Sequence, residues 1–117
     1  ITDTIEQDLE LPLFTTDPAK TVYVFHCPPY FTNLDAIPTP RHVGSKAIRK
    51  FISQSQPHLV LTGHIHETVD VTEQYKDQIN GSPCMTAGNG EDPKQLSVLV
   101  FDLYKPMETV KRRILTL

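Results

Sequence analysis

The chain has 117 residues, 38% of them hydrophobic, and a formal net charge of −3, which predicts one domain or part of one, with a real core. The mildly acidic balance, without a long Lys/Arg block, argues against a nucleic-acid scaffold or an anionic membrane as partner. No apolar run approaches the roughly 20 residues of a membrane span, and the N-terminus lacks the basic and apolar segments of a signal peptide. With two cysteines, Cys27 and Cys84, we expect a cytoplasmic protein with free thiols.

The first element expected is a short helix near the N-terminus. Asp3 and Glu6 have the spacing of a capping box, and Ile5 and Leu9 fall on one face of the helix that would follow. The chain begins at an isoleucine rather than an initiating methionine, so we expect further sequence upstream.

The first strand expected covers residues 21–25. These residues are aromatic and β-branched without polar alternation, which predicts a strand covered on both faces. His26 closes the strand, and the Cys-Pro-Pro sequence at 27–29 prevents both continued sheet pairing and an immediate helix. His26 is therefore held at a strand end beside an opening, although a buried histidine bonded to a carbonyl is the better interpretation of this position when it is viewed alone.

Residues 30–41 contain prolines and no sustained period, which predicts a long loop over the strand ends. A helix should follow, beginning near Gly44 and Ser45 and ending before Pro57. Its apolar face would comprise Val43, Ala47, Ile48, Phe51 and Ile52. His42, just before the helix, is a weak candidate for contact with an anion or substrate, because a solvated loop histidine needs no special explanation.

The apolar residues 59–62 form the next expected strand, and strand, helix and strand together predict a βαβ unit with parallel strands. Ligands of open parallel sheets bind beyond the carboxyl ends of the strands, where His26 and His64 both fall. On an extended backbone His64 and His66 would point the same way, with Cα atoms about 6.5 Å apart. Two surface or hydrogen-bonded loop histidines are the alternative.

The remaining elements are expected to be strands and turns. Residues 73–78 look solvated, Asn-Gly at 80–81 indicates a turn, and residues 83–87 form a short strand. The Gly-Asn-Gly loop at 88–90 could present N–H groups to an anion, though an ordinary turn is as good an interpretation.

The C-terminal segment predicts an antiparallel hairpin. Residues 96–103 have the composition of a buried strand, and residues 109–115 that of a second strand after a turn. Arg112 and Arg113 are interpreted as solvent-facing residues that protect an edge strand from association.

The βαβ topology should gather three imidazoles, those of His26, His64 and His66. Three histidines can fill much of the coordination shell of a first-row metal and leave one position for water. Water on such an ion ionises near neutral pH and can attack an ester phosphorus, while the metal neutralises charge on the phosphoryl oxygens. The arrangement therefore favours hydrolysis.

Residues 26–29 resemble the His-x-Pro-Pro motif, and residues 63–67 the Gly-His-x-His motif, of the calcineurin-like metallophosphoesterases. Residues 41–45 and the following helix also resemble bacterial and archaeal members. The resemblance, close over residues 21–68, implies an α/β fold that is part of a four-layer αββα sandwich, with a βαβ unit followed by C-terminal antiparallel strands. It also implies a phosphate-ester substrate and two divalent ions, of Mn, Fe, Zn, Co or Ni, about 3.5 to 4 Å apart, sharing a hydroxide that attacks phosphorus.

By motif position, His26 and His64 would bind one metal ion and His66 the other. The family's Asp-x-His, Gly-Asp and Gly-Asn-His-Asp/Glu motifs, which supply the carboxylates and a further histidine, do not occur in these residues. Three neutral imidazoles bring no negative charge to two dications. We therefore expect residues 1–117 to be the C-terminal part of a single domain, incomplete and inactive alone, with no catalytic residue assigned.

Carboxylates within the chain are not assigned a role. Asp35, Glu67 and Asp70 lie near the predicted strand-end edge, but a solvated surface position is the simpler interpretation of each. The alternative function is a non-catalytic or mononuclear metal-binding module that lacks the N-terminal ligands. Half a sandwich would also expose an apolar sheet face, so the isolated chain should form a homo-oligomer or bind the missing N-terminal half.

Overall fold

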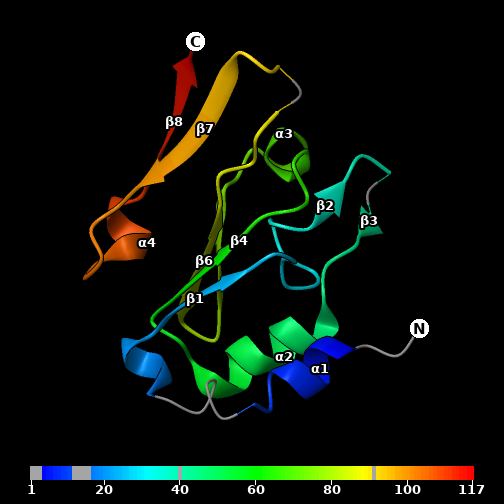
Figure 1. The fold of residues 1–117 in the computed structure, drawn as a ribbon, viewed down its shortest axis with the longest axis vertical. Helices are drawn as coiled ribbons and strands as arrows, with labels where there is room; N and C mark the ends of the chain where they lie inside the picture. Colours follow the sequence, from blue (N-terminus) through cyan, green and yellow to red (C-terminus); the bar gives the residue numbers. More distant parts are fainter. Residues whose placement is uncertain (1–3, 12–16, 40, 91) are drawn as a thin grey trace.

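The computed structural model describes residues 4–11, 17–39, 41–90 and 92–117 (Figure 1). It is a mixed α/β structure, built on one four-stranded sheet with the strand order β1-β4-β6-β5. The first three strands in that order are parallel, and β5 is antiparallel to β6. The bounds are β1 (Val22–Phe25), β4 (Leu59–Thr62), β5 (Lys76–Ile79) and β6 (Ser82–Thr86).

The predicted βαβ unit is confirmed. Strand β1 pairs in parallel with β4, and α2 (Lys46–Ser55) connects them. The helix begins where expected, because the Ser45 side chain accepts a hydrogen bond from the Ile48 N–H at 3.1 Å. It ends at Gln56, whose left-handed backbone (φ 50°) caps the last turn before the proline. Val43 precedes the helix and is exposed, so it is not part of the helical apolar face.

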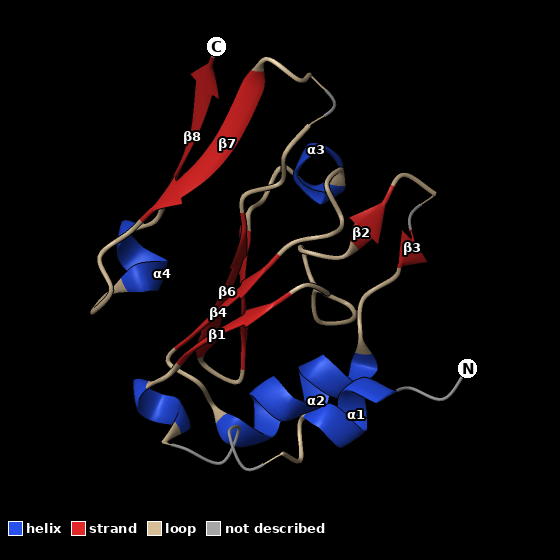
Figure 2. Cartoon of the chain, viewed as in Figure 1, coloured by secondary structure: helices blue, strands red, loops and turns tan. Residues whose placement is uncertain are grey.

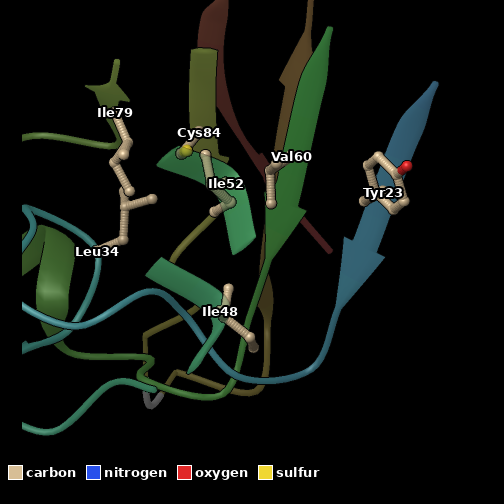
Figure 3. Close-up of a cluster of buried hydrophobic side chains, with 7 residues drawn as sticks. All are labelled: Tyr23, Leu34, Ile48, Ile52, Val60, Ile79 and Cys84. Atoms are coloured by element: carbon tan, nitrogen blue, oxygen red, sulfur yellow. The ribbon is translucent and has the colours of Figure 1, made fainter. Parts of the chain in front are cut away.

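The main core lies between the sheet and α2 (Figure 3). Helix α1 (Thr4–Asp8) packs against the same cluster through Ile5 and Leu9, as the N-terminal pattern predicts; the Asp3 half of its capping box lies outside the described residues. The cluster comprises Tyr23, Leu34, Ile48, Ile52, Val60, Ile79 and Cys84.

Strand β1 is covered on one face only, which corrects the prediction of a strand buried on both. Tyr23 is buried, whereas the side chain of Val24 on the opposite face is 75% exposed. A second apolar cluster does form on the sheet, but it gathers around Leu59 of β4 and Met85 of β6 together with Val110. The apolar composition of β1 therefore exceeds what this chain buries.

Two segments interpreted as irregular contain regular structure. Strands β2 (Ala36–Ile37) and β3 (Arg41–His42) form a small antiparallel pair within the expected long loop. Strand β5 arises largely from residues 73–78, which look solvated in the sequence, because pairing with the neighbouring β6 decides its conformation. Helix α3 (Thr68–Thr72) precedes it. The Asn-Gly turn joins β5 to β6 as predicted, with positive φ at both residues.

The C-terminal hairpin is confirmed, with different bounds (Figure 2). Strands β7 (Gln95–Val100) and β8 (Lys111–Thr116) are antiparallel, and a short helix α4 (Pro106–Thr109) replaces the simple turn. Strand β7 is not the buried strand expected, since Leu96 is 48% exposed. A 3-10 turn (Pro18–Lys20) precedes β1.

No helix in the described part of the chain is long and apolar enough to cross a membrane.

Candidate metal centre

The structure brings His26 and His64 together at one edge of the sheet. Each follows the carboxyl end of a strand, β1 or β4, and the Gly63 N–H donates to the His26 carbonyl at 3.3 Å, which continues the contact between the two strands. The imidazole centroids lie 4.5 Å apart with the rings tilted by 47°. Both residues are exposed. The prediction that parallel strand ends gather these two histidines is confirmed.

His64 sits in a tight turn rather than in an extended segment, which corrects the predicted alternation along a strand. Its φ is 70°, and the Ile65 N–H donates to the Gly63 carbonyl at 2.8 Å, the pattern of a γ-turn with strained central residue. Ile65 is buried, whereas His64 and His66 on either side of it are exposed. Burial of the isoleucine therefore keeps both histidines at the surface although the backbone is not extended.

His66 lines the same pocket as His64 but does not complete a cluster with the other two histidines. The pocket holds about 190 Å³, and its other wall is the segment 86–89, which begins at the last residue of β6. Among the described residues, no three His, Cys, Asp or Glu side chains are grouped closely enough to hold one metal ion. The structure thus provides a histidine pair, with His66 on the rim of the adjoining pocket.

Arg112 holds that wall in place, which corrects its prediction as a solvent-facing residue. Its Nε donates to the Ala87 carbonyl at 2.6 Å, and its Nη2 donates to the Gly88 carbonyl at 2.7 Å and the Ser97 hydroxyl at 3.0 Å. Arg113, in contrast, is exposed as predicted. The Gly-Asn-Gly loop is therefore fixed by the C-terminal hairpin rather than being a free turn.

Asp35 is fully buried, with 0% of its side chain exposed, so its prediction as a solvated residue is wrong. Its carboxylate accepts hydrogen bonds from the backbone N–H groups of Phe31 (2.9 Å), Thr32 (3.0 Å) and Gly44 (3.0 Å). It also lies 2.6 Å from His42 Nδ1, so His42 is not the solvated histidine expected. The sequence signal that could have indicated this burial is a short acidic side chain in a loop, where backbone N–H groups lack partners in a helix or sheet. Glu67 and Asp70 are exposed, as expected.

Both thiols are free, as predicted. Cys27 is partly buried in the loop after His26, and Cys84 lies in the core. Burial raises the pKa of the Cys84 thiol from its ordinary value of 9.0 to about 12, with a smaller contribution from the charge of Asp77. Cys84 therefore packs as a neutral side chain and is unsuited to bind a metal.

Comparison with known proteins supports the fold. No protein-family model matches the sequence, and no curated protein matches it. A solved crystal structure superposes on the chain with a TM-score of 0.61 at 19% sequence identity. The match covers 96% of this chain and 38% of that longer one, so the present residues span well under half of the protein they resemble in fold.

Proposed function

We propose that this chain is the C-terminal part of a metal-dependent phosphoesterase, and that His26 and His64 bind one of its metal ions. The observation that carries the proposal is the pairing of the two exposed imidazoles at the ends of adjacent parallel strands. The two sequence motifs that resemble those of calcineurin-like metallophosphoesterases contribute these same two residues. The substrate class is phosphate mono- or diesters.

The residues present fit one divalent transition-metal ion. Imidazole nitrogens are its ordinary ligands, at about 2.0 to 2.1 Å for zinc, and centroids 4.5 Å apart allow one nitrogen of each ring to reach a shared ion. A bound ion would supply Lewis-acid polarisation of the phosphoryl oxygens and a lowered pKa of water. His66, on the pocket rim, is the proposed ligand of a second ion.

The same residues do not complete a dinuclear centre. Glu67 and Asp70 line a neighbouring exposed pocket with His66, and they form no three-donor cluster within the described residues. Two dications need carboxylates to offset their charge, and the described residues do not group enough of them beside the histidine pair. The proposal therefore takes the missing ligands from an N-terminal half of the domain. The proposed full fold is the four-layer αββα sandwich, of which the present sheet is one half.

The exposure of one sheet face at β1 supports this division. Strand β1 is an edge strand of the sheet order, and Val24 on its open face is 75% exposed. The match to only 38% of a longer chain of similar fold points the same way. The missing N-terminal half is the proposed partner of this face, and a homo-oligomer of the isolated chain is the alternative.

Within this arrangement the chain's own groups position the ligands. The β1–β4 pairing and the γ-turn at His64 place the exposed imidazoles of His26 and His64 side by side. Arg112 fixes the opposite wall of the pocket that His64 and His66 share. These contacts pre-organise the ligands before an ion or substrate arrives, so less binding energy is lost in ordering them.

The test is hydrolysis of phosphomono- and diester substrates by the full-length protein, supplied in turn with Mn, Fe, Zn, Co and Ni. Replacing His64 by alanine should reduce bound metal and lower kcat/KM by roughly 100-fold or more, the size of effect expected when metal coordination is disturbed. The matched control is His58→Ala, since His58 precedes the other end of β4 and contacts the Leu103 carbonyl. Absence of hydrolysis with every metal would reject the proposal.

A mononuclear metal-binding module without catalysis is the second candidate. It is favoured by the absence of an acidic cluster beside the histidine pair in the described ranges. Metal analysis separates the two: one ion per protein, lost in His64→Ala but retained in His66→Ala, would indicate the module. Two ions per full-length protein, one of them dependent on His66, would indicate the phosphoesterase.

A further inference from the structure

A group of three aromatic rings, one exposed and two partly buried, comes from residues that lie between His26 and His64 along the chain. Tyr30, Phe31 and His42, together called here the aromatic platform, have ring centroids 4.7 Å apart for Phe31 and His42 and 6.1 to 6.3 Å apart for the two pairs with Tyr30. These separations are within the range of aromatic contact. Phe31 is 64% exposed, so the platform presents an apolar ring to solvent.

The exposed position of Phe31 is built by specific contacts. Its φ of 58° is in the left-handed region that non-glycine residues avoid. Buried Asp35 accepts from its N–H, and Arg49 Nη1 donates to the carbonyls of Tyr30 and Phe31, each at 3.1 Å. A buried carboxylate and a guanidinium thus hold a strained backbone in the conformation that exposes a phenylalanine.

His42 is oriented by the same carboxylate. Its Nδ1 lies 2.6 Å from Asp35 Oδ1, which orients an imidazole whose side chain is 31% exposed. Lys46 Nζ lies 5.1 Å from the Tyr30 ring centroid, within cation–π range. The platform therefore combines flat aromatic rings, held in place by a buried carboxylate, with a positive charge.

The platform is rigidly connected to the candidate metal centre. Only three residues separate His26 from Tyr30, and their backbone is fastened to the start of α2 by two hydrogen bonds, from Ser45 N to the Pro28 carbonyl and from Tyr30 N to the Ser45 carbonyl. Figure 1 shows β2, β3 and the start of α2 on the side of the sheet toward which β1 and β4 run. The platform and the histidine pair thus lie at the same end of the sheet.

We propose that the aromatic platform binds the planar ring of an aromatic phosphate ester, and specifically the base of a nucleotide, with its phosphate directed toward His26 and His64. Base–aromatic stacking tolerates different bases because every base has a π face. Lys46 adds attraction for the anionic part of the same ligand. The inference rests on the proposed function, because the direction assigned to the phosphate assumes that the histidine pair is the reaction centre.

The test compares two probes that differ only in the base, adenosine 5′-monophosphate and ribose 5-phosphate, by equilibrium binding to the full-length protein. The nucleotide should bind about 10-fold more tightly. Phe31→Gly should reduce this preference to within about twofold, and glycine suits the positive φ, so the variant removes the ring without adding strain. Phe31→Tyr, which keeps a ring, should retain the preference. The control Tyr104→Ala, at an 88% exposed tyrosine after β7, should also retain it.

Equal affinity of the two probes for the unmodified protein, or a preference that survives in Phe31→Gly, would overturn the inference. So would a lower unfolding free energy in Phe31→Gly with an unchanged preference, which would make Phe31 a packing residue beneath the missing half. Base-dependent binding without hydrolysis under any metal would instead reject the phosphoesterase and keep the platform. Hydrolysis without a preference for the base would reject the platform as a binding site and keep the phosphoesterase.

Discussion

The most informative perturbation is Gly44→Ala, because Gly44 lies where the loop after His26 crosses the start of α2. A Cβ at this position would lie 2.6 Å from the Pro28 carbonyl oxygen and 2.7 Å from the carbonyl carbon and oxygen of Pro29, all backbone atoms. Neither proline can move without disturbing the hydrogen bonds that link this loop to Ser45 at 2.8 and 3.0 Å. The methyl group therefore separates the loop from the helix.

The expected loss follows from these contacts. Overpacking a rigid site costs about 1–3 kcal/mol, each weakened hydrogen bond adds about 0.5–1.5 kcal/mol, and the stiffer unfolded chain offsets about 0.4–1 kcal/mol. The unfolding free energy of Gly44→Ala should thus fall by about 3 kcal/mol, measured by urea denaturation of the full-length protein. Gly90→Ala is the control, since a Cβ at Gly90 meets no atom within 4 Å. A difference below about 0.5 kcal/mol between the two variants would refute the reasoning.

Three further predictions concern single side chains. His64→Gly should be more stable than His64→Ala by about 1 kcal/mol in urea denaturation, because glycine tolerates the φ of 70°, while both variants lose metal; equal stability would contradict the strain. Arg112→Ala should lower the unfolding free energy by about 1–3 kcal/mol through its unsatisfied carbonyl partners, and Arg113→Ala by less than about 0.5 kcal/mol; similar losses would disprove the anchoring role. Burial raises the pKa of the Cys84 thiol to about 12 in the folded chain. Above pH 9.0 the thiol therefore loses its proton in the unfolded chain but keeps it in the folded one. Stability should then fall between these pH values by up to about 1.4 kcal/mol per unit, a slope that Cys84→Ala should reduce.

The sequence predicts those elements whose cause is local. The apolar runs of β1 and β4, the amphipathic α2 with its Ser45 cap, and the Asn-Gly turn each follow from side-chain spacing or backbone preference, and the structure contains all of them. Parallel pairing of β1 with β4 then follows from topology, which also brings His26 and His64 together. The exposure of one face of β1 cannot be predicted from the sequence. An apolar run does not tell whether the residues that pack on its second face belong to the same chain.

The features that the sequence does not predict depend on partners distant along the chain. Arg112 satisfies carbonyls 24 and 25 positions earlier, and no local pattern distinguishes it from exposed Arg113. Asp35 is buried because backbone donors surround it, which requires the β2–β3 turn to be formed already. Strand β5 is polar and becomes a strand through its pairing with β6. Helix α3 is short and β-branched, a composition that propensity alone assigns to strands.

The parallel register of β1 with β4 has a consequence for how metal binding and folding depend on each other. Val22 pairs with Leu59 and Phe25 with Thr62. In the sequence, β2, β3 and α2 all come between these two paired strands. This contact forms only after a long segment has closed on itself, at an entropic cost. The ion that we propose His26 and His64 share would stabilise only the conformation in which β1 and β4 are paired, by mass action. The ion would therefore hold the two ends of the crossover connection together. The affinity of the protein for the ion would then report how completely β1 and β4 have paired.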